Sequence, residues 1–94
     1  MSALFTFCVY LVYFIEMNIN IFGSTGIIGS KSLAIIKKFY PDIAINLLVA
    51  NNNHLKLISQ TIKYRPKFIS IKNEDKIQLI RNKIKNLETK IIKY

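Results

Sequence analysis

The chain has 94 residues, of which 51% are hydrophobic and 20% are charged, and it contains three glycines and two prolines. These values are typical of a globular chain and exclude a disordered segment or a fibrous repeat. The length excludes a two-domain enzyme and allows only a small hydrophobic core.

The charge balance is strongly basic, because 14 Lys and Arg residues against five Asp and Glu give a net charge of +9. Such a charge suits a nucleic acid or an anionic membrane. The lysines are spread along the chain, however, without an arginine-rich block or interleaved aromatic residues. We interpret them as solvated helix faces and expect no nucleic-acid partner. Cys8 is the only cysteine, which excludes an internal disulfide and favours a reducing, cytoplasmic location.

Residues 1–16 form an apolar N-terminal extension in which Glu16 is the only charged residue. A membrane-spanning helix needs about 20 apolar residues, and a secretory signal has a basic start and a small-residue cleavage site. The extension is too short for the first and lacks the features of the second. Because Met17 directly precedes the first predicted strand, we interpret residues 1–16 as an upstream extension. A short membrane-surface anchor is the alternative.

The next segment predicts a strand, a helix and a second strand. Residues 18–22 alternate apolar and polar side chains and lead into Gly23, as a short strand before a tight turn does. Residues 26–40 predict a helix with Thr25 as its capping hydroxyl. The apolar positions of this helix are Ile28, Leu33, Ile36, Phe39 and Tyr40. Residues 43–50 are almost continuously apolar, which is typical of a parallel strand covered on both faces.

The remaining residues repeat this alternation. Residues 54–64 predict a helix, and residues 68–71 predict a third strand. The apolar stripe expected along this helix is Leu55, Ile58 and Ile62. Residues 74–87 predict another helix, with Glu74 and Asp75 at its positive N-terminal end, and residues 91–94 predict the start of a fourth strand.

Strands that alternate with helices predict an α/β fold, a Rossmann-like parallel sheet of three to four strands with right-handed crossover helices. Ninety-four residues are about half of a complete domain of this kind. No turn or cap follows the last predicted strand, so we interpret the domain, residues 17–94, as incomplete.

A glycine-rich loop joins the first strand to the first helix. Gly23 allows the sharp turn, Gly26 lets the backbone approach a pyrophosphate, and Gly29 permits close packing of the helix on the strand. The backbone N–H groups of Thr25, Gly26, Ile27 and Ile28 would then meet the phosphates of a dinucleotide at the positive end of the helix. A glycine turn without a ligand is the alternative.

The end of the second strand bears on the choice of cofactor. An NAD site places Asp or Glu there to accept hydrogen bonds from the ribose hydroxyls. This chain instead has Asn51, Asn52 and Asn53, which offer neutral donors and do not repel a 2′-phosphate. The pattern favours NADP, and a simple asparagine turn is the alternative.

Three segments in order resemble one known family. GSTGIIG after the first strand, LVANNN at the end of the second and YRPKFISI leading into the third resemble the N-terminal NADPH-binding domain of 1-deoxy-D-xylulose 5-phosphate reductoisomerase. The resemblance runs from about Met17 to Tyr94. The glycine loop alone would also suit aspartate-semialdehyde dehydrogenase or related reductases.

The resemblance implies specific cofactor contacts. Thr25, Gly26, Ile27 and Ile28 would contact the cofactor phosphates, whereas Asn51, Asn52 and Asn53 would lie near the adenosine ribose and its phosphate. Two places differ from the family, which often has serine at the position of Ile27 and a glycine-lysine pair at the positions of Asn51 and Asn52.

The resemblance also implies an activity for the complete enzyme. Family members rearrange 1-deoxy-D-xylulose 5-phosphate and reduce the product with NADPH to 2-C-methyl-D-erythritol 4-phosphate, a step of isoprenoid precursor synthesis. They use Mg or Mn and form homodimers, and their metal ligands lie in a later, catalytic domain that is absent here.

The chain itself offers no catalytic or metal-ligating residue. Its acidic residues lack a His or carboxylate neighbour at ligand spacing, and His54 falls at a helix start, where capping or exposure is expected. The leading hypothesis is therefore an enzyme fragment that carries part of an NADPH site and is inactive alone. The alternative is a free-standing basic βαβ module that binds an anionic membrane or a nucleic acid.

Overall fold

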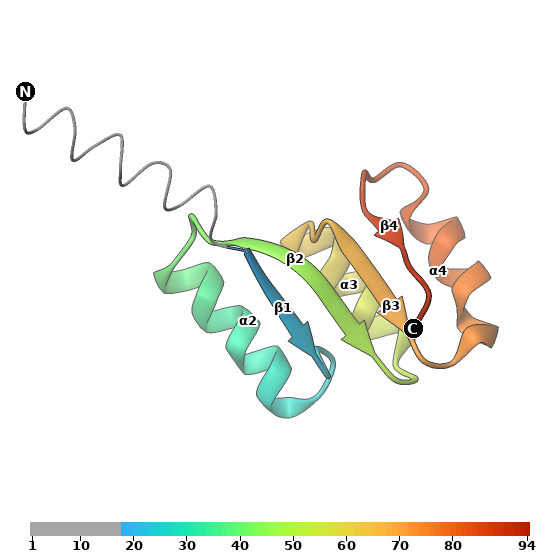
Figure 1. Cartoon of the computed structure of the whole chain (residues 1–94), viewed down its shortest axis with the longest axis horizontal. Coiled ribbons are helices and arrows are strands. Elements are labelled where there is room, and N and C mark those ends of the chain that lie inside the picture. Colours follow the sequence, from blue (N-terminus) through green and yellow to red (C-terminus); the bar gives the residue numbers. More distant parts are fainter. Residues whose placement is uncertain (1–17) are drawn as a thin grey trace, which may run out of the picture.

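The computed structural model describes residues 18–94, so the expected extension at residues 1–16 lies outside the described part. A four-stranded parallel sheet has the order β1-β2-β3-β4 and is joined by three crossover helices (Figure 1). The elements are β1 (Asn18–Phe22), α2 (Ile27–Phe39), β2 (Ala44–Ala50), α3 (His54–Tyr64), β3 (Phe68–Ile71), α4 (Ile77–Ile84) and β4 (Lys90–Ile91). The predicted Rossmann-like α/β fold is thus confirmed.

The element bounds agree closely with the sequence pattern up to β3. The third predicted helix differs, because Glu74–Lys76 form a 3₁₀ turn before α4 begins at Ile77. The Asn73 side chain accepts a hydrogen bond from the Asp75 amide and caps this turn. The helix ends at Ile84 rather than residue 87, where the Leu87 amide donates to the Ile84 carbonyl at 2.8 Å and closes a tight turn. The fourth strand is only Lys90–Ile91 instead of residues 91–94.

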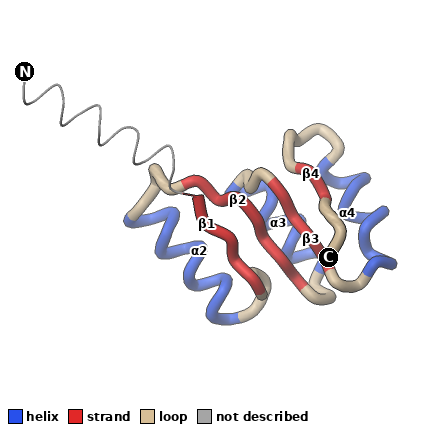
Figure 2. The backbone as a smooth tube through the Cα atoms, viewed as in Figure 1, coloured by secondary structure: helices blue, strands red, loops and turns tan. Residues whose placement is uncertain are grey.

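All three helices pack on one face of the sheet. A single core cluster contains alternate residues of β2 and β3 and residues of each helix. Its members include Leu33 of α2, Leu48 and Ala50 of β2, Leu57 and Ile58 of α3, Ile69 and Ile71 of β3, and Ile80 and Ile84 of α4. Because successive strand residues point to opposite faces, this alternation places the core between the helices and one sheet face. Among residues 18–94 no helix covers the other face, so β2 is not covered on both sides as expected (Figure 2).

The apolar stripes expected on the first two helices are partly wrong. In α2, Leu33 is buried, but Ile28 and Phe39 are 81% and 62% exposed. In α3, the buried face is Leu57, Ile58, Gln60 and Thr61, whereas Leu55 is 68% exposed. Both helices carry apolar residues on more than one side, so periodicity alone identified helices without selecting the face that packs.

Candidate nucleotide-binding site

The glycine loop leaves β1 at its carboxyl end and is fixed to the neighbouring strand. Gly23 has a φ of 72°, a conformation that glycine adopts without strain. The amides of Gly23 and Ser24 both donate to the Val49 carbonyl of β2, at 2.8 and 3.0 Å. Since Phe22 and Val49 are paired in the parallel register, the loop begins where β1 and β2 end together.

The loop and the start of α2 approach each other closely. A Cβ atom at Gly29 would collide with the Gly23 carbonyl and lie 2.8 Å from the Ser24 Cα atom. At Gly26 a Cβ atom would lie 3.3 Å from the Gly23 carbonyl oxygen. The helix is packed closely at Gly29 as expected, but its partner is the backbone of the loop rather than the strand.

The first turn of α2 presents unpaired amides. The N-cap residue is Gly26, and no side chain caps the helix, so the expected capping role of the Thr25 hydroxyl is wrong. Within residues 18–94, no acceptor is recorded for the amides of Thr25, Ile27 and Ile28. The first turn contains no acidic residue, so the positive helix end remains uncompensated. Amides in this arrangement can bind an anion.

Gly26 contributes differently from the other three predicted phosphate contacts. Its own amide donates to the Gly23 carbonyl at 3.0 Å and is therefore not available to a ligand in this conformation. Gly26 has no side chain, which leaves its backbone open to close approach.

The three asparagines lie at the same edge of the sheet as the glycine loop, directly after β2. Asn51 and Asn52 are exposed, and their side chains can reach a ligand. Asn53 is the N-cap of α3, and its side-chain oxygen accepts a hydrogen bond from the Lys56 amide at 3.1 Å. This bond engages the Asn53 side-chain oxygen, while His54 is the first residue of the helix rather than its cap.

A hydrogen bond between distant segments was not anticipated from the sequence. The Gln60 side chain of α3 donates from Nε2 to the Ser24 carbonyl at 2.7 Å, and the Ser30 hydroxyl donates to the same oxygen at 3.2 Å. A polar residue on the buried side of α3 is the signal that could have revealed it. That signal was missed because the predicted stripe shared only Ile58 with the buried side of the helix.

The described residues offer neither a metal centre nor a membrane span. In residues 18–94 no group of three or more His, Cys, Asp and Glu side chains could hold a metal ion. Over the same range, no helix combines the length and hydropathy that crossing a bilayer requires.

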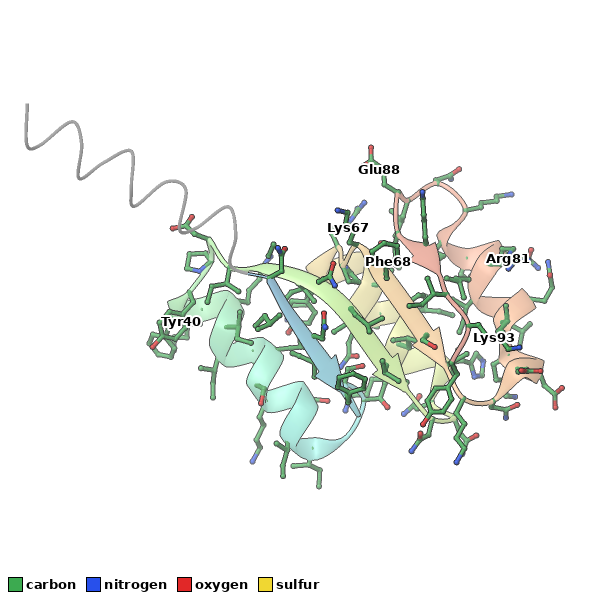
Figure 3. The ribbon with its side chains drawn as sticks, in the orientation of Figure 1. Tyr40, Lys67, Phe68, Arg81, Glu88 and Lys93 are labelled. Atoms are coloured by element: carbon green, nitrogen blue, oxygen red, sulfur yellow. The ribbon has the colours of Figure 1, made fainter. Side chains whose placement is uncertain are left out.

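A separate groove of about 910 Å³ lies at the opposite edge of the sheet. The first residues of all four strands line it: Asn18, Ala44, Phe68 and Lys90. Lys67, Phe68 and Glu88 are labelled along this edge in Figure 3. None of the predicted cofactor residues lines this groove, and ligands of open α/β sheets bind at the other, carboxyl ends of the strands.

Comparison with known proteins identifies one family. Residues 19–93 match the model of 1-deoxy-D-xylulose 5-phosphate reductoisomerase. The enzyme of that name from Porphyromonas gingivalis is 43% identical over 77 residues, which cover 81% of this chain and 20% of the relative. The Elusimicrobium minutum enzyme is 41% identical over 64 residues, covering 68% and 16% respectively.

A solved structure shares the fold and the family. DOX-P reductoisomerase in complex with NADPH, fosmidomycin and magnesium has a TM-score of 0.75 and 26% identity, over 83% of this chain and 19% of the other. The chain therefore spans about a fifth of the length of the curated relatives it matches.

Proposed function

Since this chain belongs to the 1-deoxy-D-xylulose 5-phosphate reductoisomerase family, we propose that it binds NADPH through the glycine loop and the first turn of α2. The observation that carries the proposal is the set of unpaired amides at Thr25, Ile27 and Ile28. Together with the uncapped positive end of α2, they fit the pyrophosphate of a dinucleotide.

The adenosine end of NADPH would lie against the asparagine turn. Asn51 and Asn52 are exposed at the carboxyl end of β2, next to the glycine loop. Neither carries a charge, so a ribose 2′-phosphate meets no carboxylate there. Asn53 supports this turn through its capping bond to Lys56 rather than through a direct contact.

In the domain organisation that we propose, residues 17–94 are part of an NADPH-binding domain, residues 1–16 precede it, and the catalytic residues of the family lie outside residues 17–94. NADPH supplies a hydride when bound. The residues described here bind and orient the cofactor, and none of them is assigned a catalytic role. The conversion of 1-deoxy-D-xylulose 5-phosphate to 2-C-methyl-D-erythritol 4-phosphate would require the remaining four fifths of a relative's length.

The metal of the family does not fit the described part of this chain. Mg or Mn requires clustered oxygen ligands, and residues 18–94 contain no such group. We also propose the homodimer and the cytoplasmic location, on the family membership and on the single cysteine of the chain.

Titration of the full chain with NADPH and NADH tests this function. We expect the fluorescence of NADPH to change when it binds. The Kd for NADPH should be lower than that for NADH, because the asparagine turn accepts the 2′-phosphate. No change with NADPH at millimolar protein, together with salt-dependent binding of DNA or anionic vesicles, would instead support a basic module.

A further inference from the structure

Gln60 joins α3 to the glycine loop through a buried hydrogen bond. The residue is 6% exposed, and its Nε2 atom donates to the Ser24 carbonyl at 2.7 Å across 36 positions of sequence. The Ser30 hydroxyl is a second, longer donor to the same oxygen at 3.2 Å. Gln60 is therefore the stronger constraint on the direction of this carbonyl.

Burying the polar side chain of Gln60 is unfavourable for folding unless its hydrogen bond compensates. Its Oε1 atom is buried and has no partner among the described residues, and a buried polar atom without a partner is unfavourable. Its buried neighbours on α3 include Leu57 and Ile58, so an apolar side chain would suit the position better on packing grounds alone. The advantage of glutamine at this position is that its Nε2 donor restrains the Ser24 carbonyl of the loop.

The consequence for the loop follows from peptide geometry. The Ser24 carbonyl and the Thr25 N–H belong to one peptide unit, and no peptide bond in the described residues is cis. In a trans peptide these two groups point in opposite directions. A carbonyl held inward against α3 therefore turns the Thr25 N–H outward, and no protein acceptor for that N–H is recorded within residues 18–94.

We infer that Gln60 is a positioning residue that aims the Thr25 amide at the cofactor pyrophosphate by holding the Ser24 carbonyl. This inference rests on the proposed function and adds a residue remote from the ligand to it. Without the Gln60 donor, the peptide unit between Ser24 and Thr25 loses its main restraint. Rotation of that unit would replace an N–H donor with a carbonyl oxygen, which repels phosphate.

The experiment compares Gln60→Leu with Thr61→Val in the ¹⁵N-labelled full chain. Thr61 is a matched control because it is the adjacent buried residue, and its hydroxyl donates to Leu57 within α3 at 2.8 Å, away from the loop. Three quantities are measured: the Thr25 amide resonance without ligand, the Kd for NADPH, and the midpoint of urea unfolding.

We expect both variants to lower the unfolding midpoint. Only Gln60→Leu should shift the Thr25 resonance and raise the Kd about tenfold, which corresponds to about 1.4 kcal/mol. Where the leucine variant does not fold, Gln60→Met has the same expectation, because methionine is close to glutamine in size and has no donor to the Ser24 carbonyl.

An unchanged Thr25 resonance and Kd in the Gln60 variant would overturn the inference, as would an equal rise in Kd for Thr61→Val. Should the unaltered chain bind no NADPH, the proposed function fails. The Thr25 resonance of the unliganded variants then decides the positioning role by itself.

Discussion

Each of the three glycines in the loop has its own physical reason for being glycine. Gly23 is needed for its conformation, since its φ of 72° strains other residues although a Cβ atom there would meet nothing. Gly29 is needed for its size, because a Cβ atom would strike the backbone of the loop. Gly26 has room for a Cβ atom with a small adjustment, so neither conformation nor packing requires glycine there, and we propose that it leaves space for the ligand.

Gly26→Val should abolish NADPH binding without unfolding the chain. The added side chain occupies the space through which the pyrophosphate approaches, whereas the extended φ of −75° at this residue suits any side chain. NADPH titration and urea unfolding check both parts. Ala34→Val, which adds the same side chain at an exposed position of α2, is the control and should bind normally. Retained affinity in Gly26→Val would show that the backbone approach is wrong.

Substitutions of two adjacent asparagines should have different effects, one on the free energy of unfolding and the other on the Kd for NADPH. Asn53→Ala removes the cap of α3 and should lower the free energy of unfolding by about 1 kcal/mol. Asn52→Ala removes no cap and should leave the free energy of unfolding unchanged, but it should raise the Kd for NADPH about fivefold through a lost hydrogen bond. Urea unfolding and NADPH titration of both variants measure these effects. The reverse assignment would contradict the account of this turn.

At the scale of elements, the sequence predicted which segments form helices and strands better than which sides pack. Helical spacing identified α3 at residues 54–64, as observed. Its buried side was only partly predicted, because apolar residues lie around the whole helix: Ile58 is buried as expected, whereas Leu55 and Ile62 are exposed. The hydrogen bond between Gln60 and Ser24 could not be predicted either, since it depends on how α3 docks beside the loop. The turn between β1 and α2, by contrast, could be predicted, because the glycines that form it lie within one short segment of the sequence.

Truncation of two leucines in α3 tests the observed packing. Leu57 is 0% exposed, so Leu57→Ala should lower the free energy of unfolding by about 2–5 kcal/mol. Leu55→Ala should change it by about 0.5 kcal/mol or less, because Leu55 projects into solvent. Comparable losses from both, measured by urea unfolding, would mean that the helix is rotated from its described orientation.

Across the described residues, a single layer of helices packs on the sheet. Helices cover one face within residues 18–94, whereas open α/β sheets of this class have helices on both. Within residues 18–94, β1 pairs with β2 alone. The chain spans about a fifth of its relatives' length, so a complete relative has ample sequence for the second layer and for catalysis.

Net charge should make cofactor binding sensitive to salt. The chain has a charge of +9, and its attraction for an anionic ligand is screened as ionic strength rises. We expect the Kd for NADPH to rise between low and high NaCl, and to rise less for NADH, which lacks the 2′-phosphate. Titrations at a series of salt concentrations measure both slopes. Equal slopes would argue against a contact between the protein and the 2′-phosphate.

If the first turn of α2 receives the pyrophosphate, addition of NADPH to the ¹⁵N-labelled full chain will change the chemical shifts of its amides. We expect the largest changes at Thr25, Ile27 and Ile28, with smaller ones at Asn51 and Asn52. Unmoved amides in that turn, with shifts centred on Tyr40, Phe68 and Glu88 in the groove at the other sheet edge, would contradict this expectation.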